Sequence, residues 1–247
     1  MESIKELRKI CQEPRKFCDT WHGKNFARPI SIYITVLFLK LRLSANFATG
    51  IFLLSGLAAS FLLFCPNEFM VLLGALAFQL WYILDHVDGE VARYNKQTSL
   101  TGAYFDRISH YIVHPLLFFC LGAGLFFKLK IPAMLILGFF ASFSMVLINA
   151  VTDIYELTLC QKTQKTINKP AKDIKKISFA KKTFSFFHHL CTFPMIIDIF
   201  LIFALVDMLF NKNTVIFFLW FYAICANLIW IFKLSYIVAT RKPDKIF

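Results

Sequence analysis

The sequence is poor in charge, and the charge it has is unevenly divided. Only 17% of its 247 residues are charged, with 15 acidic residues against 27 Lys and Arg. Its seven cysteines form no CxxC pair and no regular spacing, so no disulfides are expected. It has no internal repeat or low-complexity segment, and its charged first 40 residues do not resemble a cleavable signal peptide. One domain is therefore expected, with the first apolar run retained as an anchor.

Apolar residues dominate the chain. Hydrophobic residues make up 58% of it, 30 residues are Phe, and the mean hydropathy is +0.62. A soluble domain of this length would not need so much apolar surface, and six runs reach the roughly 20 residues that cross a bilayer. These runs lie near 46–64, 69–92, 103–127, 131–156, 187–210 and 214–237. The sequence therefore predicts an all-α integral membrane protein with six transmembrane helices.

The distribution of basic residues predicts how these helices are oriented. Residues 1–43 hold nine Lys and Arg, and the connection after the fourth run holds eight lysines. The connections after the first, third and fifth runs together hold only three. By the positive-inside rule, both termini are cytoplasmic in a multi-pass protein of the plasma (inner) membrane. The net charge of +12 then faces anionic lipid headgroups, so membrane lipid is the expected partner and nucleic acid is not.

The segment before the first run predicts a separate membrane-surface element. Residues 1–24 are polar and predict a short helix or a loose arm. Residues 25–43 mix apolar with basic residues, and Pro29 suits the first turn of a helix. This pattern predicts an amphipathic helix in the membrane interface, and a simple continuation of the first span is the alternative.

Three regions follow from these patterns. The Lys-rich segment 161–183 is expected to be a solvated loop or a surface helix within the membrane domain. The predicted regions are a cytoplasmic arm with the interfacial helix at 1–43, the six-helix membrane domain at 44–240, and a cytoplasmic tail at 241–247.

Acidic residues inside the second and third apolar runs form one helix-spaced set. Asp85 and Asp88 share a helix face, and Asp106 and His110 are four apart on the next helix. The connection between these runs is short and basic, so the two helices are antiparallel neighbours. Their acidic faces can then meet at one polar cavity on the cytoplasmic side. Because carboxylates at membrane depth are costly, this set predicts a functional site.

The residue types around these acids predict a site for a metal ion and a pyrophosphate. Three carboxylates this close repel one another unless a positive charge lies between them. Mg²⁺ or Mn²⁺ takes oxygen ligands and bridges to substrate phosphates. Gly89, Ala92 and Gly102 leave room for a bulky ligand, and Arg93 and Arg107 can donate to phosphate. The alternative is a proton relay or an interhelical hydrogen bond in an ion-coupled transporter.

The same stretch resembles the signature of the CDP-alcohol phosphotransferases. Seven residue types agree with that signature in identity and spacing: Asp85, Asp88, Gly89, Ala92, Arg93, Gly102 and Asp106. The family also resembles this chain in having six spans and a preceding interfacial helix. Asn46 and Thr49 are similar to a Pro-Asn-x-x-Thr element that opens the first span in the family, although the Pro is missing here.

The resemblance implies a function and assigns roles to residues. A CDP-linked alcohol, usually CDP-diacylglycerol, would bind through two Mg²⁺ or Mn²⁺ ions, and a second alcohol would attack phosphorus and release CMP. This is a reaction of phospholipid biosynthesis, and the family implies a homodimer. The implied metal ligands are Asp85, Asp88, Asp106 and His110. The implied substrate contacts are Asn46, Thr49, Gly89, Ala92, Arg93, Ser99, Gly102 and Arg107. The acceptor stays open among inositol phosphate, glycerol phosphate, serine and others, and a smaller CDP-alcohol could replace the lipid donor.

One position departs from the family pattern. His110 stands where a fourth Asp is expected, which removes one negative charge and weakens the second ion's site or favours a softer metal. Histidine is also the commonest general base, so His110 is predicted to be the catalytic residue. His114 could share a metal or proton with it, but a packed histidine is favoured, and His86 is expected to be structural. The other possibility is a degenerate relative that binds CDP-lipid or a partner without turnover.

Overall fold

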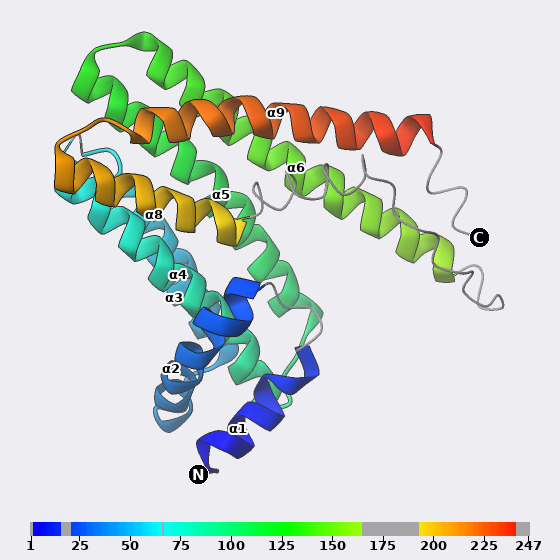
Figure 1. Ribbon diagram of the computed structural model, residues 1–247. Helices are drawn as coiled ribbons and strands as arrows, with labels where there is room; N and C mark the ends of the chain where they lie inside the picture. Colours follow the sequence, from blue (N-terminus) through cyan, green and yellow to red (C-terminus); the bar gives the residue numbers. More distant parts are fainter. Residues whose placement is uncertain (1, 16–20, 66, 165–192, 241–247) are drawn as a thin grey trace.

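The computed structural model describes residues 2–15, 21–65, 67–164 and 193–240. These residues form helices joined by short connections and include no strand (Figure 1). The elements are α1 (Ile4–Cys11), the 3-10 helix η1 (Glu13–Arg15), the π-helix η2 (Gly23–Ala27), α2 (Arg28–Lys40), α3 (Ala45–Leu62), α4 (Glu68–Tyr94), α5 (Leu100–Leu129), α6 (Pro132–Gln164), α8 (Phe193–Phe210) and α9 (Val215–Ala239).

Six of the described helices are long and apolar enough to cross a membrane, which confirms the predicted multi-pass membrane fold. They are α3, α4, α5, Pro132–Thr158 of α6, α8 and α9. The third span, α5, begins at Leu100 and not near the predicted 103. The Ser99 side chain caps it there by accepting the Gly102 amide at 3.0 Å. The predicted start of the fifth span at 187, most of the segment 161–183 and the tail 241–247 lie outside the described residues.

The predicted helix before the first span is a separate element. Pro29 lies in the first turn of α2, as expected, and α2 ends at Lys40. Arg42 then adopts a left-handed conformation with a φ of 54°. Ser44 starts α3 by accepting the Phe47 amide at 3.2 Å. A continuous helix from α2 into α3 is therefore excluded, and residues 4–11 supply the predicted short helix before it.

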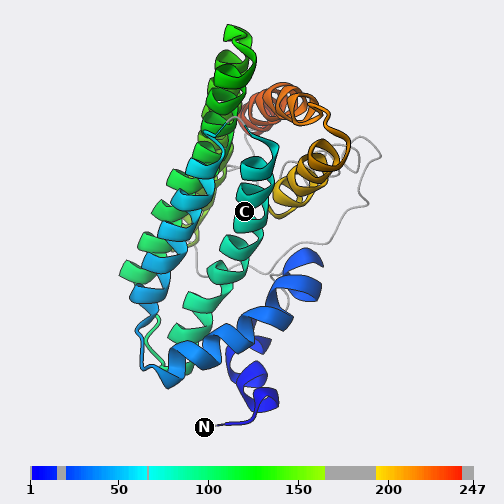
Figure 2. The ribbon, with the colours of Figure 1, turned by 90° about the vertical axis from the view of Figure 1, so that its left-hand side faces the viewer.

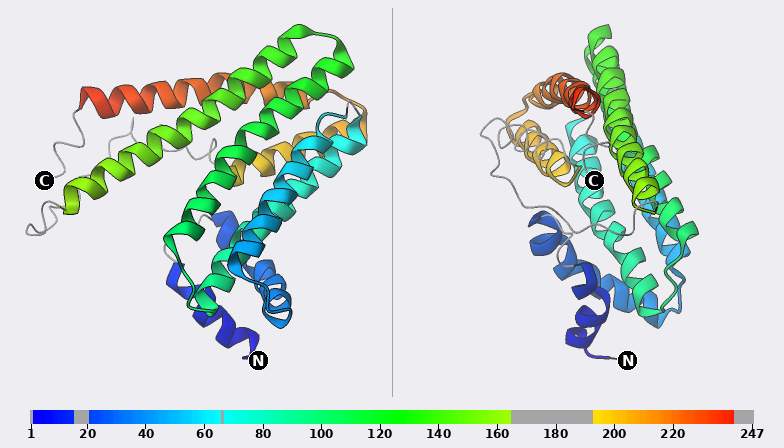
Figure 3. Two further views of the ribbon diagram at one scale, coloured as in Figure 1. Left: turned by 180° about the vertical axis from the view of Figure 1, so that it is seen from behind. Right: turned by 90° about the vertical axis from the view of Figure 1, so that its right-hand side faces the viewer.

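The helices pack in an order that brings the signature residues together at one end. α3 packs against α4 and α5, α4 also contacts α8, and α6 packs against α5 and α9. We call the end where α4 finishes and α5 begins the signature end. α1 and α2 lie there against α4 (Figure 2). α6 and α9 run side by side and diverge from α3 and α4 (Figure 3).

Glycines allow close helix approach within the membrane domain. A Cβ added to Gly122 of α5 would lie 2.6 Å from the Gly138 Cα of α6. A Cβ on Gly124 would lie 2.0 Å from the Leu63 carbonyl oxygen. Small residues stabilise membrane helix pairs because they let the backbones approach and pack. The crossings of α5 with α6 and with the end of α3 therefore depend on these glycines.

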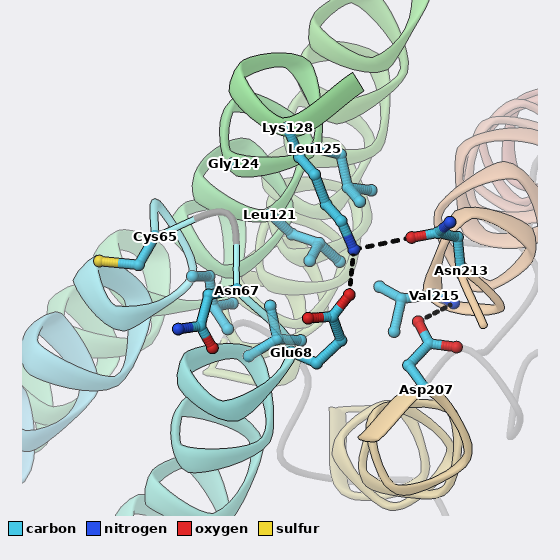
Figure 4. A pocket seen from close by; sticks show the side chains of 12 residues that line it. Cys65, Asn67, Glu68, Leu121, Gly124, Leu125, Lys128, Asp207, Asn213 and Val215 are labelled. Atoms are coloured by element: carbon cyan, nitrogen blue, oxygen red, sulfur yellow. Dashed lines mark hydrogen bonds and ion pairs between the residues drawn. The ribbon is translucent and has the colours of Figure 1, made fainter. Parts of the chain in front are cut away.

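The end opposite the signature end is closed by paired polar groups (Figure 4). Lys128 of α5 contacts Glu68 of α4 and donates to Asn213 at 2.7 Å. Asp207 of α8 accepts the Val215 amide at 3.1 Å and so caps α9. The cavity between these residues is only about 20 Å³, room for about one water molecule. These polar residues therefore join the ends of four helices. The cavity between them is too small for a substrate.

The α5–α6 crossing gives a test of the packing. We expect Gly122→Ala to lower the stability by about 1–3 kcal/mol, because the added methyl meets backbone atoms that cannot rotate away. The matched control is Gly50→Ala on α3, where an added Cβ meets nothing within 4 Å. Thermal unfolding of the purified protein in detergent measures both. Equal melting temperatures for the two variants would contradict the close crossing.

Candidate functional site

A cavity of about 180 Å³ opens at the signature end between α3, α4 and α5. Its lining includes all the predicted substrate contacts except Arg107. The lining residues are Ala45, Asn46, Thr49, Asp88, Gly89, Ala92, Arg93, Gln97, Thr98, Ser99, Gly102, Ala103 and Asp106. The fold thus brings residues from three helices and one connection to a single opening.

Two glycines keep this cavity open. A Cβ on Gly102 would lie 3.2 Å from the Ser99 Oγ and 3.6 Å from the Asn46 Oδ1. A Cβ on Gly89 would lie 3.1 Å from Nη1 of Arg93. Any side chain at these positions would press on polar groups that line the cavity. The glycines therefore expose backbone to a ligand and leave the neighbouring side chains in place.

Asp85, Asp106 and His110 form a compact cluster beside the cavity. One possible ligand atom from each lies within 4.8 Å of the others. The Nε2 atom of His110 lies 3.0 Å from Oδ1 of Asp85 and 3.3 Å from Oδ1 of Asp106. This Asp106 oxygen is buried and makes no hydrogen bond. The predicted meeting of the two acidic faces therefore occurs between α4 and α5.

Asp88 has a different environment from Asp85. It is 8% exposed and lines the cavity. Its carboxylate accepts the Thr49 hydroxyl at 2.8 Å and the Gly89 amide at 2.5 Å. Thr49, expected from the family resemblance to contact substrate, thus holds a carboxylate in this structure. These two bonds fix how Asp88 is presented to the cavity.

The donor set fits a divalent cation. Carboxylate oxygens such as those of Asp85 and Asp106 are ligands that Mg²⁺ and Mn²⁺ accept, and His110 adds an imidazole nitrogen. Asp88, also predicted to be a ligand, lies outside this cluster and lines the cavity. The buried Asp106 oxygen without a hydrogen bond is a group that a cation would satisfy. These residues can therefore hold a cation at the wall of the cavity.

His110 is held by a shell of rings. Its ring centroid lies 5.3 Å from Phe52 and 5.6 Å from Trp81, both in edge-to-face geometry. Its Nδ1 atom lies 3.1 Å from Nε2 of His114. His114 is buried and stacks on Phe193 with centroids 3.6 Å apart, so the expectation of a packed histidine is confirmed. Only the Nε2 side of His110 therefore faces the acids.

His86 lies beside the acidic cluster and makes its shorter contact to its own helix. Its Nδ1 atom lies 3.0 Å from the Tyr82 carbonyl oxygen, one turn back along α4. The same atom is 3.9 Å from Asp85. Its ring packs edge-to-face on Tyr82. These contacts are those of a structural histidine.

The two arginines of the predicted site lie in different surroundings. Arg93 lines the cavity, and its Nε donates to the Cys11 carbonyl at 2.5 Å. Arg107 is 58% exposed at its side chain and pairs with Asp153 of α6 at 3.3 Å, outside the cavity lining. Tyr111 donates to the same Asp153 at 3.0 Å. The structure thus places Arg93 at the site and directs Arg107 toward α6.

Sequence reasoning missed a second buried acid, Glu90, on α4, the helix that carries Asp85 and Asp88. Glu90 is 0% exposed and faces α1 and α2 instead of the cavity. Its partners lie far away in sequence: Gln12 at the end of α1, and Ser31 and Thr35 on α2. The available signal was a charged residue two positions after Asp88, on the other side of an apolar helix. Its meaning required the positions of α1 and α2.

These features define a class: a multi-pass membrane protein with an acid-lined cavity between three of its helices. The sequence pattern of the CDP-alcohol phosphatidyltransferases matches residues 42–206. The chain belongs to the CDP-alcohol phosphatidyltransferase family, as the signature predicted. No curated protein sequence matches it.

A solved structure shares the fold. It is that of Mycobacterium tuberculosis phosphatidylinositol phosphate synthase (PgsA1) with CDP-DAG bound. The similarity has a TM-score of 0.61 and 17% identity, and covers 84% of this chain and 92% of the synthase. At this identity the likeness establishes the common fold.

Removal of single ligands tests the cation site. We expect Asp106→Asn to weaken Mn²⁺ binding by about tenfold or more, since a ligand contributes at least as much as the groups that orient it. Asp153→Asn is the matched control, because Asp153 lies on a neighbouring helix and pairs with Arg107. Electron paramagnetic resonance of Mn²⁺ with the protein in nanodiscs measures the affinity. Equal Mn²⁺ affinity in both variants would show that the cation does not bind at this cluster.

Proposed function

We propose that the protein transfers a phosphatidyl group from CDP-diacylglycerol to a polar alcohol and releases CMP. The observation that carries the proposal is the convergence of the seven signature residues on the cavity and the adjoining acidic cluster. Membership of the family and the bound CDP-DAG of the mycobacterial synthase support a CDP-lipid donor. The membrane domain also supports it, since a lipid substrate reaches the site from the bilayer.

The cavity supplies groups that suit a pyrophosphate. One or two Mg²⁺ or Mn²⁺ ions held by Asp85, Asp88, Asp106 and His110 would neutralise the phosphate oxygens and make the phosphorus more electrophilic. Arg93 at the wall donates to a phosphate oxygen. Gly89 lets the pyrophosphate approach the backbone. Asn46 and Ser99 provide polar side chains for the nucleotide.

His110 accepts the proton of the acceptor alcohol in this proposal. The hydroxyl oxygen forms a bond to the phosphorus that carries the lipid, while its proton moves to Nε2 of His110. The bond from that phosphorus to the CMP oxygen breaks, and CMP leaves with the electron pair. His114 contacts the opposite ring nitrogen and so orients the base. Since one nitrogen faces the cluster, His110 acts at any moment as base or as cation ligand.

The proposed location follows from the charges. Nine basic residues precede the first span, and α1 and α2, which carry five of them, lie at the signature end against α4. By the positive-inside rule, that end, the site and both termini are cytoplasmic, in the plasma (inner) membrane. The proposed assembly is a homodimer, on the family resemblance alone.

The second candidate is a family member that binds CDP-lipid without turnover. The observation that favours it is His110 in place of the fourth acid. A site with one carboxylate fewer holds cationic charge less tightly, which weakens catalysis before it abolishes donor binding. The two candidates differ only in CMP release.

An acceptor panel separates the candidates. Purified protein is incubated with labelled CDP-diacylglycerol and either Mg²⁺ or Mn²⁺. One acceptor is added to each reaction (inositol phosphate, glycerol phosphate or serine), and the released CMP is measured. We expect CMP with one acceptor, and His110→Gln should lower kcat about 100-fold or more because the base is lost. Asp153→Asn should retain activity.

Two further results decide the role of His110. Mn²⁺ affinity unchanged in His110→Gln supports the base, whereas a lowered affinity makes His110 a ligand. Greater activity in His110→Asp would mean that the native site is impaired. Tight CDP-lipid binding without CMP from any acceptor would establish the second candidate.

A further inference from the structure

Glu90 is a fully buried residue of α4, and its carboxylate does not face the cavity. It is 0% exposed, although a buried carboxylate is costly without partners. Its Oε1 accepts Gln12 Nε2 at 2.8 Å and the Ser31 hydroxyl at 2.7 Å. Its Oε2 accepts the Thr35 hydroxyl at 2.6 Å. All three donors belong to the segment before the first span. We call its described residues, 2–15 and 21–40, the arm.

The donors are themselves joined across the arm. Gln12, just after α1, also donates to the Arg28 carbonyl at 2.9 Å. Arg28, at the start of α2, returns a bond from Nη1 to the Gln12 carbonyl at 2.8 Å. Glu90 therefore binds both helices of the arm at the point where they are linked. Its removal takes the acceptor from the buried Thr35 hydroxyl and leaves Gln12 and Ser31 with only the Arg28 carbonyl.

A second contact connects the arm to the cavity. The carbonyl of Cys11, the residue before Gln12, accepts Nε of Arg93 at 2.5 Å. Arg93 lies three residues after Glu90 on α4, and it lines the cavity. A guanidinium is planar, so fixing its Nε edge sets the plane and direction of its two Nη groups. The docked arm therefore orients the arginine that we place against the donor phosphate.

We propose that Glu90 is a positioning residue for donor binding, which acts by docking the arm so that the Cys11 carbonyl holds Arg93 in the cavity. The inference rests on the proposed function for the identity of the donor. The arm then affects donor affinity without touching the donor. By thermodynamic linkage, donor binding stabilises the docked arm by the same factor.

Cys11 provides a direct reporter of docking. Its side chain is 0% exposed and packs with Leu7 of α1 and Ile32 of α2. Burial raises the pKa of the Cys11 thiol to about 11. The thiolate reacts with maleimides, so a docked Cys11 is protected both by access and by protonation. Labelling of Cys11, followed by mass spectrometry of its peptide, measures undocking without any turnover.

The test compares Glu90→Leu with Glu90→Gln and Thr35→Val. We expect Glu90→Leu to raise the Cys11 labelling rate and the KM for CDP-diacylglycerol by about tenfold or more, with kcat little changed. Glu90→Gln keeps one acceptor oxygen and should restore most of both values. Thr35→Val removes one donor with the carboxylate intact and gives an intermediate result if Glu90→Leu does not fold.

The matched control is Tyr94→Phe at the end of the same helix. It removes a bond between the Tyr94 hydroxyl and the exposed Glu2 at 2.6 Å, while the ring remains against α1. Labelling and KM should both stay at the values of the unmodified protein. Added CDP-diacylglycerol should slow Cys11 labelling in the unmodified protein.

The outcomes are distinct. Faster Cys11 labelling in Glu90→Leu with an unchanged KM would show that docking does not affect the donor and overturn the proposal. Unchanged labelling and KM would show that Glu90 does not dock the arm, which also overturns it. If the unmodified protein releases no CMP, the proposed reaction fails, but slower Cys11 labelling with CDP-diacylglycerol still supports the link between donor and arm. No donor effect on labelling would then overturn that link.

Discussion

The cost of placing carboxylates at membrane depth governs this structure. Each such acid needs a donor or a positive charge, because lipid offers neither. The described structure meets this need with contacts between helices. These contacts pair Asp85 with His110, Asp88 with Thr49, Glu90 with Ser31 and Thr35, Asp198 with His22, and Asp207 with Thr214. Asp106 is also paired with His110, whose Nε2 atom lies 3.3 Å from its Oδ1, but this buried oxygen makes no regular hydrogen bond. The polar contacts therefore fix the helix arrangement, and His110 joins the two carboxylates of the cluster.

The replacement of the fourth acid by His110 fits its surroundings. Phe52 and Trp81 present ring edges and faces to it, and His114 contacts its far nitrogen. Aromatic rings pack well against an imidazole, whereas a carboxylate there would face apolar surface. The ring shell comes from three helices and from Phe193 behind His114. The histidine is therefore part of a packed unit in which one nitrogen stays directed at the acids.

Local patterns in the sequence predicted much of this protein. Runs of apolar residues gave the six spans, because crossing a bilayer sets a minimum length. Helical spacing placed Asp85, Asp88, Asp106 and His110 on facing helices, because the connection between them is short. The signature gave the family. Helix ends were less certain, since a single cap such as Ser99 shifts them by a turn.

Other features depended on contacts between distant segments. No local pattern pairs Glu90 with Thr35, 55 residues away, or directs Arg107 to Asp153 instead of the cavity. The same holds for the bond from Arg93 to Cys11, 82 residues apart. The sequence alone determined which groups are present and which helix face they share, because both depend on near neighbours along the chain. Only the tertiary structure decided which partner each buried polar group takes, because that choice depends on which helices pack together and how closely.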